Sequence, residues 1–115
     1  MKKPEQIQHE INLLIDIIQN IFITTRQTNA AKNRIQELKQ LKLLIESGIS
    51  EKGLIEQLNK LIEKRVYIKT QIDSVKYKIL IQNKNPKREV KKLTKYYDLE
   101  YIEQQIKNLN YLLDK

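Results

Sequence analysis

The amino-acid sequence predicts an all-α protein, and three observations lead to that prediction. The 115 residues include only two glycines and two prolines, so long stretches contain no residue that breaks a helix. Hydrophobic residues, mostly isoleucine and leucine, make up 40% of the chain. They recur at spacings of three and four residues, which places them on one face of an α-helix. At this length we expect a single domain over residues 1–115.

The first helical run begins at Pro4, because a proline in the first turn of a helix loses no hydrogen bond. Thr28 or Asn29 can cap a second helix within the run, yet no glycine or proline forces a break there. Two alternatives therefore remain: one helix over 4–47, or two helices that meet near 26–29. The apolar stripe fades in the middle of the run, and its members are Ile7, Ile11, Leu14, Ile18, Ile21, Ala31, Ile35, Leu38, Leu41 and Ile45.

A second long helix is predicted over 51–83, after a turn in which Gly48 ends the preceding helix and Ser50 caps the next. Its apolar residues follow a heptad pattern, and Ile55, Ile62, Val66 and Leu80 flank this seam. Arg65 interrupts the seam; either its stem packs while the guanidinium reaches water, which we favour, or it sets the oligomeric state. The seam consists of Leu54, Leu58, Leu61, Arg65, Ile68, Ile72, Val75 and Ile79, with Gln82 at its end.

Two shorter helices are predicted after the break at Pro86, which disfavours helical backbone in the residue before it. The first covers 86–95 and points Val90 and Leu93 inward. The second covers 98–113 and is capped by Asp98. Its apolar face consists of Leu99, Ile102, Ile106, Leu109 and Leu113.

These elements predict a long antiparallel helical hairpin or coiled coil, 4–47 against 51–83, with the C-terminal helix folded back onto it. If the first run breaks near 26–29, the same elements form a compact four-helix bundle. The hairpin leaves apolar stripes that a single neighbouring helix cannot cover. Because an exposed apolar stripe is a binding surface, we expect self-association into a homo-oligomer or binding to a helical protein partner.

The net charge of +8 is concentrated in residues 58–97, which hold twelve Lys/Arg against three Asp/Glu. On one helix Lys84, Arg88, Lys91 and Lys95 would share a side. Lysine and arginine side chains can neutralise phosphates, and the neighbouring tyrosines can stack on bases, so this segment is a candidate DNA- or RNA-binding site. An ordinary solvated helix explains the same residues equally well. The candidate residues of the segment are Lys84, Lys87, Arg88, Lys91, Lys92, Lys95, Tyr96 and Tyr97.

Residue types that support catalysis are scarce in this chain. It contains no cysteine and a single histidine, His9, and neither glycine lies in a phosphate-binding loop. Glu5 and Asp16 can share a helix side with His9, but a solvent-facing helix surface explains all three better. We therefore expect neither enzymatic activity, nor a metal site, nor a cofactor.

The N-terminal residues lack the apolar segment of a signal peptide, and the most apolar stretch, 11–23, is too short and too polar to span a bilayer. We therefore expect a cytoplasmic protein. The leading functional hypothesis is a non-catalytic interaction protein, namely an assembly element, adaptor or binding inhibitor of the kind that phages and mobile elements encode. Nucleic-acid association through 84–97 is the alternative, and binding to an anionic membrane surface ranks third.

Overall fold

The computed structural model describes residues 1–20 and 22–115, and this part of the chain contains five α-helices and no strand. The all-α prediction is therefore confirmed. The chain forms two compact units: unit 1 comprises Met1–Glu51 and Tyr111–Lys115, and unit 2 comprises Lys52–Asn110. The single domain, and the choice between a hairpin and a four-helix bundle, stay predictions. The helices are α1 (Pro4–Ile18), α2 (Thr25–Glu46), α3 (Glu51–Ile81), α4 (Lys87–Tyr96) and α5 (Leu99–Leu112).

The first helical run consists of two helices, α1 and α2, so the continuous helix over 4–47 was wrong. The break between them lies between Ile18 and Thr25, earlier in the chain than the position near 26–29 that the two-helix alternative gave. Thr24 is the cap: its hydroxyl accepts a hydrogen bond from the Gln27 amide at 3.2 Å. The Gln27 side chain accepts one in return from the Thr24 amide at 3.0 Å. This reciprocal capping box satisfies two N–H groups that the helix leaves unpaired.

The caps predicted at Thr28 and Asn29 both lie inside α2. Thr28 donates its hydroxyl hydrogen to the Thr24 carbonyl at 3.0 Å, as a threonine within a helix does. Ile21, which the sequence assigned to the first apolar stripe, lies outside the described residues.

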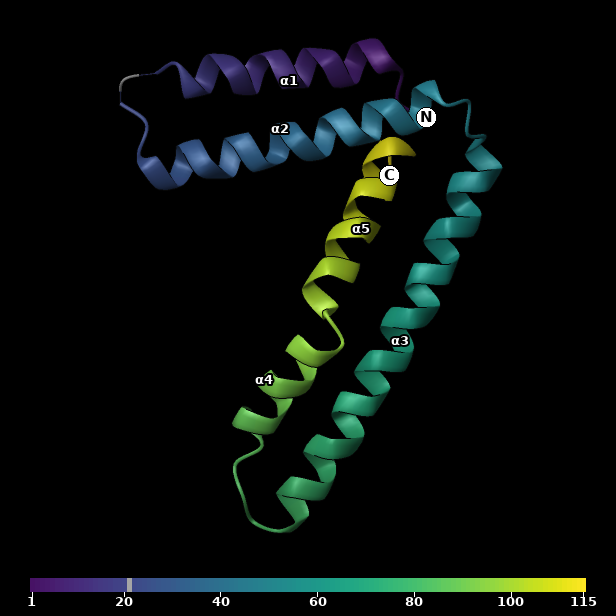
Figure 1. Cartoon of the computed structure of the whole chain (residues 1–115). Coiled ribbons are helices and arrows are strands. Elements are labelled where there is room, and N and C mark those ends of the chain that lie inside the picture. The colour runs from purple at the N-terminus through teal and green to yellow at the C-terminus, as the bar shows by residue number, and fades with distance from the viewer. Residues whose placement is uncertain (21) are drawn as a thin grey trace. The chain divides into compact units, whose positions relative to one another are not determined.

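Helices α1 and α2 pack against each other in unit 1 (Figure 1). The Lys42 ammonium group donates a hydrogen bond across this contact to the Gln8 side chain at 2.9 Å. Residues 111–115 belong to the same unit, and the Lys2 amide donates to the Leu112 carbonyl at 2.6 Å. The buried residues of the two helices all belong to the predicted stripe, and they are Ile7, Ile11, Ala31, Ile35, Leu38 and Leu41. The stripe residues Leu14, Ile18 and Ile45 are half-buried.

Helix α2 ends at the predicted glycine. Gly48 has a φ angle of 87°, in the left-handed region that a glycine adopts without steric cost. Helix α3 then begins at the predicted residue and ends at Ile81, two residues earlier than predicted. Asn83, with a φ angle of 57°, turns the chain out of the helix.

The predicted heptad seam lies on the inner side of α3. Leu54, Leu58, Ile68 and Ile72 are buried. Its other members, Leu61, Arg65, Val75 and Ile79, are half-buried, whereas Gln82 is exposed beyond the end of the helix.

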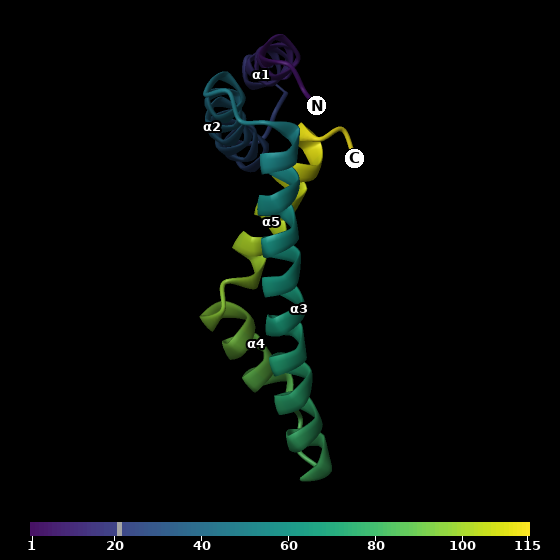
Figure 2. The same ribbon diagram turned by 90° about the vertical axis from the view of Figure 1, so that its right-hand side faces the viewer.

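In both views α4 and α5 run alongside α3 within unit 2 (Figures 1 and 2). An ion pair between Lys69 of α3 and Glu103 of α5, at 3.5 Å, lies between two of these helices. Asp98 does not have the extended conformation of the cap predicted for α5. Its φ angle of 53° is left-handed, and its amide donates to the Lys95 carbonyl, so it ends α4 instead.

Candidate functional site

The outer side of α4 carries five cations, which we call the α4 cationic surface: Lys87, Arg88, Lys91, Lys92 and Lys95. All five side chains are exposed. Val90 and Leu93 lie on the opposite side of the helix, Thr94 lies at the edge of the cationic side, and all three are half-buried. The 3.6-residue period therefore directs every cation of α4 to solvent. The one acid of α4, Glu89, lies 3.9 Å from Lys92, and an exposed pair of this kind neutralises little of the field.

Lys84 does not share a helix face with these cations, so that part of the sequence interpretation was wrong. It lies in the connection between α3 and α4, after Asn83 has turned the chain out of α3. Spacings of three and four residues align side chains only while the backbone stays helical. Lys84 is exposed, and its role in binding an anion stays a prediction.

Two tyrosines follow the α4 cationic surface. Tyr96 is 79% exposed and Tyr97 is half-buried, and their rings meet edge to face at a centroid distance of 5.0 Å. Of the two, Tyr96 offers a free ring face for stacking. Asp98 and Glu100 lie beside Lys91 and Lys95 around a hollow of about 420 Å³, and their carboxylates reduce the positive potential at this end of the surface.

A second apolar stripe runs along the outside of α3. It consists of Ile62, Val66, Tyr77 and Leu80, and we call it the second stripe. At about 100° per residue, these four positions fall within a sector of about 60°. Ile62 is half-buried, but Val66 is 58%, Tyr77 67% and Leu80 50% exposed. Only Lys69 and Asp73 interrupt the stripe.

Sequence reasoning noted Ile62, Val66 and Leu80 as flanks of the seam, but it did not separate them from the seam as a surface of their own. It missed Tyr77 altogether. The spacings of four, eleven and three residues along the stripe were the available signal. The polar residues in the middle of the stripe obscured that signal.

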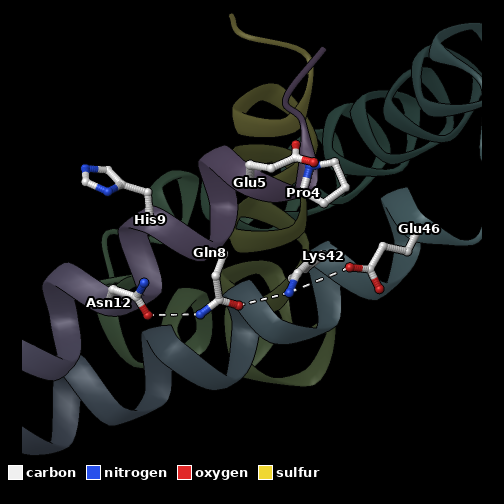
Figure 3. A pocket seen from close by; sticks show the side chains of 7 residues that line it. All are labelled: Pro4, Glu5, Gln8, His9, Asn12, Lys42 and Glu46. Carbon is white, nitrogen blue, oxygen red and sulfur yellow. Dashed lines mark hydrogen bonds and ion pairs between the residues drawn. The ribbon is translucent and has the colours of Figure 1, made fainter.

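A polar groove of about 480 Å³ lies between α1 and α2 (Figure 3). Gln8 donates a hydrogen bond to Asn12 at 3.0 Å and accepts one from Lys42, whose ammonium group also lies 3.7 Å from Glu46. The imidazole of His9 points away from this series of contacts. No group of three or more histidine, aspartate or glutamate side chains in the described part of the chain is placed to hold a metal ion. Of the contacts in the groove, the hydrogen bond from Lys42 to Gln8 joins α1 to α2, and the other two lie within one helix each.

The ring of Tyr111 contacts two cations from distant parts of unit 1. The Lys2 ammonium lies 5.0 Å and the Arg34 guanidinium 5.4 Å from the centre of its ring, distances typical of cation–π contacts. Its hydroxyl oxygen is buried and has no hydrogen-bond partner of good geometry. Burial, and then the nearby carboxylate of Glu10, raise the pKa of Tyr111 to about 12.

Asp114 completes this cluster. Its carboxylate lies 2.9 Å from the Lys2 ammonium and 3.3 Å from the amino group of Met1. Hydrogen bonds from these two groups lower the pKa of the exposed Asp114 carboxyl. The cluster therefore connects residues 1–2 to residues 111–115.

No protein-family model, curated protein or solved structure matches this chain. No helix among the described residues combines the length and the apolar character needed to cross a membrane. The function is therefore inferred from the residues of this chain.

Proposed function

We propose that the protein acts by binding a helical protein partner, without catalysis, and that the second stripe of α3 is the surface that binds. The observation that carries this proposal is the exposure of three large apolar side chains, Val66, Tyr77 and Leu80, on one face of one helix. Each is at least half exposed to water, so covering them with a partner removes apolar surface from water at about 25 cal/mol per Å².

The shape of the stripe supports a helix as the partner. Its members recur at helical spacing over about five turns, and a narrow stripe of this kind is complementary to the apolar face of another helix. Tyr77 is the residue expected to contribute most, because tyrosines supply large contact areas with few rotatable bonds. An assembly element, an adaptor and a binding inhibitor would all use such a surface.

The first prediction compares two tyrosines of α3. Tyr77→Glu places a charge in the second stripe, whereas Tyr67→Glu makes the same change on another face of the helix, at a side chain that is 58% exposed. We expect Tyr77→Glu to weaken binding at least about tenfold and Tyr67→Glu to leave it almost unchanged. The protein and both variants would be compared by affinity purification from the native host and by sedimentation velocity. Circular dichroism would confirm equal helicity.

A chain that stays monomeric at tens of micromolar, and captures no protein whose recovery depends on Tyr77, would contradict the proposal. The same conclusion would follow if Tyr67→Glu and Tyr77→Glu weakened binding equally. Such a result would mean that added charge, and not the second stripe, determines the outcome.

Nucleic-acid association is the second candidate function, and the α4 cationic surface favours it. Five exposed cations on ten residues, followed by the exposed ring of Tyr96, combine phosphate neutralisation with a stacking surface. We expect these cations to contact phosphates and not base edges, so binding would be independent of base sequence and dominated by counterion release.

The second prediction concerns the salt dependence of this association. If all five cations contact phosphates of duplex DNA, the logarithm of the binding constant should fall against that of salt concentration with a slope of about −4.5. Reversing Arg88, Lys91 and Lys92 to glutamate should abolish binding, and Tyr96→Ala should weaken binding to single strands about tenfold. Fluorescence anisotropy with labelled DNA and RNA compares the variants at about 50 mM salt, and a series of increasing salt concentrations gives the slope.

Absence of binding to either nucleic acid at this low salt concentration would exclude the second candidate. Co-sedimentation with vesicles containing anionic lipids, run with the same variants, would show whether the α4 cationic surface serves a membrane surface instead.

A further inference from the structure

We infer that the partner of the second stripe is a second copy of this chain, with the two α3 helices paired antiparallel about the level of residue 71. The inference rests on the proposed function, because it names the partner of the same surface. Two observations carry it: the symmetric placement of the apolar residues along the stripe, and the opposite signs of the two charges that interrupt it.

The stripe is nearly symmetric about its midpoint. Ile62 and Leu80 lie nine residues before and after position 71, and Val66 and Tyr77 lie five and six residues from it. In an antiparallel pair each residue faces the one at the same distance beyond the midpoint. Ile62 therefore meets Leu80 of the partner subunit, and Val66 meets Tyr77 of the partner subunit. The stripe covers about 27 Å along the helix at about 1.5 Å per residue.

The charges in the stripe select this orientation. Lys69 and Asp73 each lie two residues from the midpoint. In the antiparallel pair Lys69 faces Asp73 of the partner subunit, and the symmetry repeats this attractive contact. A parallel pair in register would place Lys69 opposite the same lysine and Asp73 opposite the same aspartate, which repels twice. The ion pair of Lys69 with Glu103 leaves further donor hydrogens on the ammonium group for a second carboxylate.

The orientation can be tested by cross-linking, because the chain contains no cysteine that would interfere. We expect a mixture of Ile62→Cys and Leu80→Cys proteins to form a disulfide-linked dimer under mild oxidation, and each variant alone to stay uncross-linked. A control mixture of Lys64→Cys and Lys78→Cys places its cysteines seven residues before and after position 71, on the face of α3 that points away from the second stripe, and both side chains are exposed. It should not cross-link.

Cross-linking of Ile62→Cys or Leu80→Cys alone, without a preference for the mixture, would overturn the antiparallel arrangement. Equal cross-linking of the control mixture would overturn the assignment to the second stripe. Absence of any cross-link, with a monomer in sedimentation equilibrium at tens of micromolar, would overturn self-association itself.

A charge-exchange experiment tests the register. Lys69→Glu and Asp73→Lys each replace two attractive contacts by two repulsive ones, so each should weaken self-association about tenfold. An equimolar mixture of the two variants should associate as tightly as the original protein, because both contacts in the mixed dimer are attractive again. Mixing cannot repair a contact within one chain. A mixture no tighter than the single variants would therefore contradict the register.

The outcomes separate this inference from the proposed function. A chain that stays monomeric but captures another protein, whose recovery Tyr77→Glu abolishes and Tyr67→Glu preserves, would leave the proposed function standing and overturn the second copy as the partner. A monomer without any Tyr77-dependent partner would overturn both.

Discussion

Among single residues, Tyr111 shows how a local environment changes both chemistry and stability. Its ring is contacted by the cations of Lys2 and Arg34, while its buried hydroxyl faces the charge of Glu10 without a well-formed hydrogen bond. The neutral phenol is therefore strongly preferred over the phenolate in the folded state. Because of this preference, the free energy of unfolding should change with pH in the alkaline range.

The third prediction follows from the raised pKa of Tyr111, about 12 when folded against about 10 in an unfolded chain. An unfolded chain loses this proton first, so the contribution of Tyr111 is fully present below pH 10 and is lost as the pH rises towards 12. Urea unfolding at both ends of this window should show a larger loss for the original protein than for Tyr111→Phe. An equal loss in both would contradict the shift, as would a spectrophotometric titration in which Tyr111→Phe removes no ionisation near pH 12.

At the scale of helices, the ends are determined by short side-chain patterns more than by the apolar periodicity. Thr24 and Gln27 start α2 with a reciprocal pair of hydrogen bonds, and Gly48 follows its last turn in a left-handed conformation. The periodicity, by contrast, identified the buried faces of α2 and α3 but not where α1 stops. Capping residues and turns therefore determine where these helices begin and end, and the apolar stripes determine which face is buried.

The fourth prediction tests the capping box of α2. Thr24→Ala removes the hydroxyl that accepts a hydrogen bond from the Gln27 amide, and should lower the free energy of unfolding by about 1 kcal/mol. The control is Thr28→Ala, which lies inside the helix, and alanine favours a helix more than threonine does. Thermal unfolding followed by circular dichroism measures both. A cost for Thr28→Ala equal to that for Thr24→Ala would mean that the helix begins later than the structure indicates.

For the whole molecule, the fold class and the faces of the helices were predictable from the sequence because they depend on composition and local spacing. The scarcity of glycine and proline predicted the helices, and the heptad pattern predicted the inner side of α3. The contacts of Lys2 and Arg34 with Tyr111 were not predictable, because they join residues far apart in the chain. Periodicity says nothing about such pairs.

The candidate surfaces were predictable in part. The five cations of α4 were identified from their number and spacing, but Lys84 was placed on their helix although Asn83 turns the chain before it. The second stripe was hidden because Lys69 and Asp73 occupy its middle, where a simple apolar template expects leucine or isoleucine. The charges that concealed the stripe are the ones that we infer to determine its pairing.

Sedimentation equilibrium over a concentration series, with the original protein, Tyr77→Glu and Tyr67→Glu in parallel, tests the role of the second stripe most directly. We predict that the weight-average mass of the original protein and of Tyr67→Glu rises from 13.8 kDa towards twice that value as concentration increases to tens of micromolar. The mass of Tyr77→Glu should stay at the monomer value. A monomer at all concentrations, or association that Tyr77→Glu leaves intact, would contradict self-association through this surface.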